Sequence, residues 1–449
     1  MKFDSLIIGG GLAGLVCGIR CAQAGLKTGI ISRGESGLAF SSGTIDLMGT
    51  GQNRESLIDP FKGIEWMLLK NPEHPYGKVG LDNIHQAMSW FQTLSREIEL
   101  PYAPIAEGKN QHRITALGAL RPTYLSPASM VHMPIEGKQT GFHRVAVVNI
   151  EGFRDFQPEL ARHNLRCLAE FQGVEVVSAT IKLPSEALGN RDPGTMRSVE
   201  LSRQLDSDRA ISILAEKLKA AIGHADLVLL PSVLSLSNGS ERLAQLSELS
   251  GYKISELATL PPSLPGLRLS ERLQQRFHRL GGLMMSGDKA DKGIIEQGKV
   301  QSISTHGNNQ MALIADHIIL ASGSFMSGGL VADRNRIRES IFGLDVNTDS
   351  DRPQWANQKF LNGKAHAFTG FGVVVDQYMR PRKDNETVEN LYCIGSVLGH
   401  AQPVEEGSAG GIAISTGWAA AERIIQKAAI QQKTAVQKTS SQEEIHHVR

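Results

Sequence analysis

Three glycines near the start of the sequence have the types and spacing of a turn that binds phosphate. In such a turn the first glycine permits a tight bend, the second lets backbone amides approach a phosphate, and the third lets the next helix pack close to the strand. A phosphate there meets the unpaired N–H groups at the start of a helix. The whole turn comprises Gly9, Gly10, Gly11, Leu12, Ala13 and Gly14.

The segments around this turn decide its interpretation, because the glycine pattern alone is a weak signal. The apolar segment 3–8 precedes it, apolar residues at helical spacing follow over 15–22, and residues 25–31 have the pattern of a second strand. A strand, a helix and a strand in this order form the nucleotide-binding unit of doubly wound α/β proteins. The sequence therefore predicts a nucleotide at the glycine turn.

The end of the second strand lacks the acidic residue that usually binds an adenosine ribose. The strand ends in Ser32 and Arg33, and Glu35 follows a few residues later. Three explanations are open. Ser32 or Glu35 replaces the acid, Arg33 binds an extra phosphate, or the ligand is a mononucleotide such as FMN and has no adenosine.

Two later strands and one helix also carry small residues of the kind found around cofactors. Segments 315–323 and 390–399 are apolar strands that end in small residues, and a small-residue helix follows them. Their order after the N-terminal turn favours a shared cofactor site. The residues predicted to bind the cofactor here are Ala321, Ser322, Gly323, Gly395, Ser396, Gly410 and Gly411.

A long insertion separates the first nucleotide-binding unit from these later segments. Strand-like stretches at 143–150, 174–180 and 226–231 alternate with helical ones at 155–170, 209–222 and 240–249, which predicts a second α/β unit with a parallel sheet. We therefore expect a discontinuous Rossmann-like domain and an inserted α/β domain. The expected boundaries are 1–50, 262–345 and 370–425 for the first domain, 51–261 for the inserted one, 346–369 for a small insertion and 426–449 for a polar, disordered tail.

Composition excludes several other classes of protein. The 449 residues carry a formal net charge of +1, so no basic field indicates nucleic acid, and the four cysteines are too few and too scattered for a disulfide framework or an iron–sulfur cluster. No metal site is expected. The sequence enters a strand without a signal-like leader, and no apolar run reaches the roughly 20 residues that span a bilayer. We expect a cytoplasmic protein whose membrane contact is peripheral.

Taken together, these residues resemble the two-glycine-motif flavoproteins of the fumarate reductase and glycerol-3-phosphate dehydrogenase type. More closely, the sequence resembles the B-subunit family of bacterial anaerobic glycerol-3-phosphate dehydrogenase. The resemblance extends from Met1 to about Ile425, and its distinctive stretches are 40–47, 74–76, 113–122, 260–269, 321–332 and 394–399. It implies a Rossmann-like FAD/NAD(P)-binding flavoprotein fold.

The resemblance also implies a function and partners. Such a protein carries FMN, with FAD as the alternative, beside an FAD-containing catalytic A subunit and an iron–sulfur C subunit that anchors the complex on the inner face of the inner membrane. The complex oxidises sn-glycerol 3-phosphate to dihydroxyacetone phosphate and passes electrons toward menaquinone. A free-standing flavin oxidoreductase acting on another hydroxy or unsaturated acid, and a non-redox scaffold subunit, remain alternatives.

The resemblance assigns roles near the flavin. The turn Ser41, Ser42 and Gly43 contacts the flavin tail or ring, and the helix start at Gly410 and Gly411 stabilises negative charge near flavin N1–C2=O.

Other candidates come from side-chain chemistry. Arg121 and Arg268 lie in apolar stretches and are candidates for binding a substrate anion. His400 follows the second glycine strand closely and is the candidate proton donor.

Overall fold

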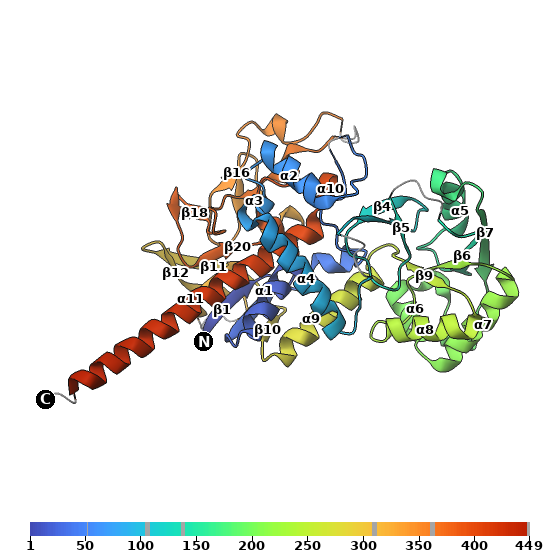
Figure 1. Ribbon diagram of the computed structural model, residues 1–449, viewed down its shortest axis with the longest axis horizontal. Helices are drawn as coiled ribbons and strands as arrows, with labels where there is room; N and C mark the ends of the chain where they lie inside the picture. Colours follow the sequence, from blue (N-terminus) through green and yellow to red (C-terminus); the bar gives the residue numbers. More distant parts are fainter. Residues whose placement is uncertain (52, 104–107, 136–139, 308–311, 360–363, 447–449) are drawn as a thin grey trace.

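The computed structural model describes residues 1–446 apart from 52, 104–107, 136–139, 308–311 and 360–363, and only the backbone of 431–446. Two α/β bodies lie side by side, and α11 projects from the larger one (Figure 1). The larger body contains the predicted glycine turn, and the smaller one is the predicted inserted domain.

A five-stranded parallel sheet forms the centre of the larger body. Its order is β10-β2-β1-β13-β20, so the chain leaves β1 toward one side and returns on the other side at β13. Alternate residues of β1 enter two cores: Ile7 faces the helices, whereas Leu6 and Ile8 face the layer of β11 and β12. Burial on both faces explains the continuous apolar runs of these strands. The strands are β1 (Lys2–Ile8), β2 (Thr28–Ser32), β10 (Leu283–Ser286), β13 (Ile314–Leu320) and β20 (Leu391–Cys393).

Helices cover one face of this sheet. The N-terminal helix α1 (Leu12–Gln23) packs between α11 (Ala409–His446) and α9 (Leu264–Arg279), and Arg20 of α1 pairs with Glu422 of α11 at 2.5 Å. Helix α11 continues to His446, where the sequence predicted a disordered tail from 426.

The predicted domain boundary at residue 51 is wrong for the first part of the insertion. Helices α2 (Pro60–Lys70), α3 (Pro75–Val79) and α4 (Leu81–Glu97) pack on α11 or on one another, and their buried residues Ile64, Tyr76 and Phe91 belong to the core of the larger body. The apolar spacing of these helices predicts one buried face but does not say which body covers it.

The inserted domain proper is a four-stranded parallel sheet of order β7-β6-β8-β9 with its own core. Its strands confirm the predicted alternation: β6 (Arg144–Ile150), β7 (Glu175–Ile181), β8 (Leu227–Pro231) and β9 (Ile254–Leu257). Its helices are α5 (Pro158–Arg166), α6 (Ser198–Gln204), α7 (Asp208–Ile222) and α8 (Gly239–Ser250).

A small antiparallel sheet joins the two bodies. Its order is β4-β3-β5, and side chains alternate between its two faces. Ile114 and Met133 enter the core of the inserted domain, whereas Thr123 on the other face contacts the Ile45 carbonyl of the larger body. The strands are β3 (Gln111–Ile114), β4 (Leu120–Thr123) and β5 (His132–Pro134).

Short antiparallel pairs and one short helix complete the larger body. All of them follow β10 along the chain. They are β11 (Ala290–Glu296) with β12 (Lys299–Thr305), β14 (Leu330–Ala332) with β15 (Ile337–Glu339), β16 (Val346–Asn347) with β17 (Gly372–Val373), β18 (Arg382–Lys383) with β19 (Glu386–Thr387), and α10 (Pro403–Glu406). No helix in the described part of the chain combines the length and apolar character needed to cross a bilayer.

Candidate flavin site

The five parallel strands place most of the predicted cofactor residues at one edge. The glycine turn follows β1, Ser32 ends β2, Ala321 follows β13 and Gly395 comes shortly after β20. The carboxyl ends of parallel strands lie at the same edge of the sheet, so these segments meet at that edge. They lie beside the point where the strand order reverses, since β2 is on one side of β1 and β13 is on the other. Open α/β sheets bind ligands at such a point.

The glycines of the turn are required for different physical reasons. Gly9 has φ 122°, and a Cβ there would lie 2.1 Å from the Ala321 carbonyl oxygen. A Cβ on Gly14 would lie 2.0 Å from the Gly9 carbonyl oxygen. Gly11 differs, because the nearest atom to its Cβ position is Ser36 Cβ at 4.0 Å. Gly9 and Gly14 are therefore needed by the fold, and the space beside Gly11 is open to a ligand.

Polar groups without partners line this edge. The backbone N–H groups of Gly11, Leu12 and Ala13, at the start of α1, have no backbone acceptor within the described residues. The Ser322 hydroxyl is buried and also lacks a partner there. Since helix N-termini favour anions and buried polar groups are normally hydrogen-bonded, these donors fit a phosphate of the cofactor.

The residues that follow β13 and β20 support the turn. Gly323 and Gly395 both have positive φ, 81° and 69°. A Cβ on Gly395 would lie 2.8 Å from Ala13 Cβ, so this glycine lets the segment approach α1 closely, and its N–H donates to Thr416 Oγ1 at 2.9 Å. Ser396 next to it is exposed.

The end of β2 offers no carboxylate beside the turn. Ser32 is buried, donates to the Gly34 carbonyl at 3.3 Å, and packs so closely on Gly10 that a Cβ there would lie 2.6 Å from Ser32 Oγ. Arg33 and Glu35 are exposed. Ser32 is thus already used within the fold, which leaves Arg33 and Glu35 as the open polar groups.

The turn after β2 is held by its own hydroxyls. Ser41 Oγ donates to the Leu38 carbonyl at 2.9 Å and accepts from the Gly43 N–H at 3.2 Å, so it closes the turn. Ser42 Oγ lies 2.8 Å from Thr44 Oγ1, and Thr44 Oγ1 donates to Asp46 Oδ1 at 3.4 Å. Ser42 is the residue of this turn whose hydroxyl contacts only another hydroxyl and stays available to a ligand.

The two glycines at the start of α11 pack against the segment that follows this turn. Cβ atoms would lie 3.2 Å from Ile45 Cα at Gly410 and 2.3 Å from Tyr76 Oη at Gly411. The Gly411 N–H is also already bonded to the Asp46 carbonyl at 2.9 Å, so this amide is not free to donate to a flavin. The Gly410 N–H has no backbone acceptor within the described residues, and its predicted role stands as a prediction.

His400 lies against a different set of residues. Its N–H donates to the Gly370 carbonyl at 2.9 Å and its carbonyl accepts from Asn71 Nδ2 at 2.6 Å, and neither partner belongs to the glycine turn. Burial lowers the pKa of its half-buried ring; nearby Glu73 opposes this and Lys78 and His74 reinforce it. A neutral imidazole suits a base better than a proton donor near pH 7.

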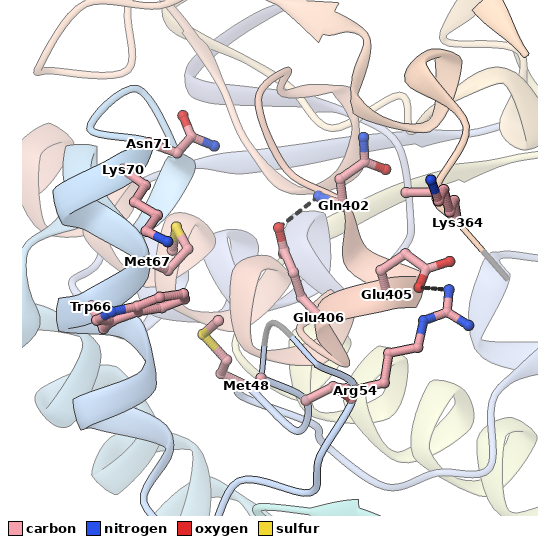
Figure 2. A pocket seen from close by; sticks show the side chains of 13 residues that line it. Met48, Arg54, Trp66, Met67, Lys70, Asn71, Lys364, Gln402, Glu405 and Glu406 are labelled. Carbon is pink, nitrogen blue, oxygen red and sulfur yellow. Dashed lines mark hydrogen bonds and ion pairs between the residues drawn. The ribbon is translucent and has the colours of Figure 1, made fainter. Parts of the chain in front are cut away.

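A cavity of about 420 Å³ lies between α2 and α10, and its wall includes Asn71, which binds the His400 carbonyl. Figure 2 shows Trp66, Met67 and Lys70 on one side and Gln402, Glu405 and Glu406 on the other. Lys70 Nζ lies 4.1 Å from the centre of the Trp66 ring, and Arg54 pairs with Glu405 at 2.5 Å. No motif in the sequence indicated this cavity, because its wall comes from four separate segments.

A largely buried pair that includes Glu406 of the cavity wall fixes the start of α11. His74 Nε2 lies 3.3 Å from Glu406 Oε2, which also accepts from Ser408 Oγ at 2.7 Å, and Glu406 Oε1 accepts from the Gln402 N–H at 2.9 Å. Burial alone would raise the pKa of Glu406, but His74 and these hydrogen bonds hold it below its usual value. The stretch 74–76 is therefore structural.

The two predicted anion-binding arginines have different environments. Arg268 is not available to a substrate, because its guanidinium is 5% exposed and binds Glu256 through Nη1 at 2.6 Å and Nη2 at 3.0 Å. Its Nε donates to the Ser235 carbonyl at 2.9 Å. Arg121 is exposed on β4 and stays a candidate. No cluster of three metal-ligating side chains occurs among the residues that the structure describes.

Comparison with known proteins agrees with this geometry. Residues 4–412 match the model of the FAD binding domain family, so the chain is a flavin-binding protein of that class. Proteins named as the B subunit of anaerobic glycerol-3-phosphate dehydrogenase are 38% identical over 94% of this chain in Vibrio vulnificus strain YJ016, and 35% identical over 95% of it in Aliivibrio fischeri strain ATCC 700601 / ES114. The match covers 96% of each relative, and the chain belongs to this B-subunit family.

Solved structures that align with nearly the whole chain include one at low sequence identity. It is 3-ketosteroid delta1-dehydrogenase from Sterolibacterium denitrificans, with a TM-score of 0.40 and 11% identity over 95% of this chain and 100% of that one.

Proposed function

We propose that this chain is the flavin-bearing B subunit of an anaerobic glycerol-3-phosphate dehydrogenase, which oxidises sn-glycerol 3-phosphate to dihydroxyacetone phosphate. The observation that carries the proposal is the combination of the open position at Gly11 with unpartnered N–H groups at the start of α1, in a chain whose B-subunit relatives match it almost end to end. Oxidation of the alcohol releases two electrons and two protons, and a bound flavin supplies the acceptor for the electrons.

The residues of this chain hold and orient that cofactor. The start of α1 binds the phosphate, and Ser322 donates to it or to the sugar-like chain beside it. Ser42 and the Gly410 N–H face the ring, where a donor near N1–C2=O stabilises a negatively charged reduced ring. In this proposal the Gly395 segment positions α1 and does not contact the reacting atoms.

The cofactor that we propose is FMN. Ser32 is occupied by the fold and no carboxylate ends β2, so the usual contact to an adenosine ribose is missing. An exposed Arg33 near the turn suits the second negative charge of a terminal phosphate. FAD is the alternative, with Glu35 at the ribose.

The proposed partners are an FAD-containing A subunit and an iron–sulfur C subunit on the inner face of the inner membrane. Through them electrons pass toward menaquinone. The four cysteines do not form a cluster for an iron–sulfur centre: Cys17 and Cys21 are buried beside each other on α1, Cys393 is buried on β20, and Cys167 is exposed. We place the chain in the cytoplasm, attached to the membrane only through its partners.

The test is to purify the chain alone and with the two partners. We expect one non-covalent flavin per chain, identified as FMN by mass spectrometry, and quinone reduction by glycerol 3-phosphate only in the assembled complex. A released FAD contradicts the mononucleotide argument alone. A chain without flavin supports the scaffold alternative, and full quinone reduction by the isolated chain contradicts the proposed division of labour.

A further inference from the structure

The sheet that joins the two bodies carries three nitrogen-bearing side chains in one row. Arg113 of β3 lies directly opposite Arg121 of β4 and directly opposite His132 of β5. Directly paired residues of an antiparallel sheet point to the same face. This face is the one on which Thr123 contacts the larger body, so the row faces the segment 44–46 beside the candidate flavin site.

The row has more positive charge than its neighbours balance. Two arginines directly opposite each other repel, and such pairs destabilise a sheet unless something compensates. Among the described residues neither arginine has a hydrogen bond or an ion pair, and Asp46 is the nearby carboxylate that favours the charge of Arg113. Burial lowers the pKa of Arg113, and the charge of Arg121 lowers it further.

A buried donor on this face also lacks an acceptor. Arg113 Nε is shielded from solvent and has no partner within the described residues, whereas the ring of His132 is also influenced by a backbone hydrogen bond with Met130. A buried guanidinium nitrogen without an acceptor is costly, so this arrangement indicates that a ligand completes it. Two adjacent guanidinium groups offer a planar set of donors that fits a doubly charged phosphate better than a single carboxylate.

We infer that Arg113, Arg121 and His132 form the binding site for the phosphate group of a small phosphate monoester, placed between the inserted domain and the flavin. This deepens the proposed function, on which it rests, because it gives this chain its own substrate-phosphate site. The position follows from contacts: Arg113 lies near Asp46, Asp46 accepts from Thr44, and Thr44 contacts Ser42 of the predicted flavin turn.

The experiment measures binding of three probes to the purified chain by calorimetry: sn-glycerol 3-phosphate, inorganic phosphate and glycerol. We expect the two phosphates to bind and glycerol not to bind. Arg113→Gln and Arg121→Gln should each weaken phosphate binding by about ten-fold or more, since hydrogen bonds to charged groups are lost. Arg166→Gln is the matched control, because it removes an exposed arginine of the inserted domain and should change nothing.

Thermal denaturation keeps the test decisive if Arg113→Gln folds poorly. In phosphate-free buffer the Arg121→Gln variant should unfold at the same or a higher temperature than the unchanged chain, because a repulsion is removed, and added phosphate should raise its unfolding temperature much less. Equal phosphate binding in all variants overturns the inference, as does a chain that binds no phosphate. Flavin content reports separately on the proposed function, so a yellow chain without phosphate binding refutes only the site.

Discussion

The buried ion pair between Arg268 of α9 and Glu256 of β9 joins the two bodies, and its removal should cost much of their joint stability. Replacing Arg268 by Met leaves a carboxylate that is 0% exposed without a counter-charge. It also leaves the Leu234 and Ser235 carbonyls without their donor. Loss of one partner of a buried pair typically costs about 3–5 kcal/mol. The double variant Arg268→Met with Glu256→Leu removes the stranded charge and should recover most of that loss.

Urea denaturation measures this loss of stability, and the positions of the tryptophans show which body is destabilised. Trp66, Trp90, Trp355 and Trp418 all lie outside 104–261, so their fluorescence reports on the larger body while circular dichroism reports on both. We expect the single variant to unfold at lower urea by circular dichroism, with the double variant close to the unchanged chain. A single variant destabilised by less than about 1 kcal/mol, or a double variant as unstable as the single one, refutes the reasoning.

Three further predictions use the same structure. Gly11→Ala should leave thermal stability unchanged but lower the flavin absorbance per chain, whereas Gly9→Ala should fold poorly because its Cβ would meet Ala321. Equal behaviour of the two variants contradicts the different roles assigned to these glycines. The pKa of Glu406 is below its ordinary value of 4.5, so its ionisation stabilises the fold above that pH, and this stability is lost as the pH falls through the folded pKa. Glu406→Gln should therefore flatten the dependence of the unfolding free energy on pH between about 6 and 3. An unchanged slope argues against this role. Iodoacetamide should label Cys167 in the native protein and the three buried cysteines only after unfolding; mass mapping of labelled Cys17 in native protein contradicts this.

Local patterns in the sequence predicted the helices and strands well. They predicted less well which of the two α/β bodies each helix belongs to. The strand–turn–helix at Gly9 and the alternating elements of the inserted domain follow from apolar periodicity, which is a local property. Helices α3 and α4 have the same kind of apolar face, but the surface that covers it is supplied by α11, more than 300 residues later in the chain. Periodicity carries no information about such a partner.

The sequence predicted the site residues whose backbone conformation requires glycine. It was less informative about side chains whose role depends on a partner elsewhere in the fold. Gly9 and Gly14 are dictated by contacts within the turn. Arg268 and Arg121 have similar apolar neighbours in sequence, yet one meets a buried carboxylate and the other meets Arg113 across a strand pair. Apolar neighbours in the sequence therefore do not distinguish a structural arginine from one that is free for a ligand, because the partner is set by how β9 meets α9 and how β3 pairs with β4.

The strand order of the larger sheet has a consequence for synthesis on the ribosome. β1 can pair with β2 early, but its other edge pairs with β13, where Lys2 lies beside Ile314, so this edge waits for roughly 300 further residues before its partner exists. At about 5–20 residues per second this delay is roughly 15–60 s. The inserted domain pairs strands only within 144–257 and can fold during that interval. Since Ala321 and Gly395 of the predicted site follow β13 and β20, we expect flavin to enter only a nearly finished chain, and one edge of β1 to stay unpaired until then.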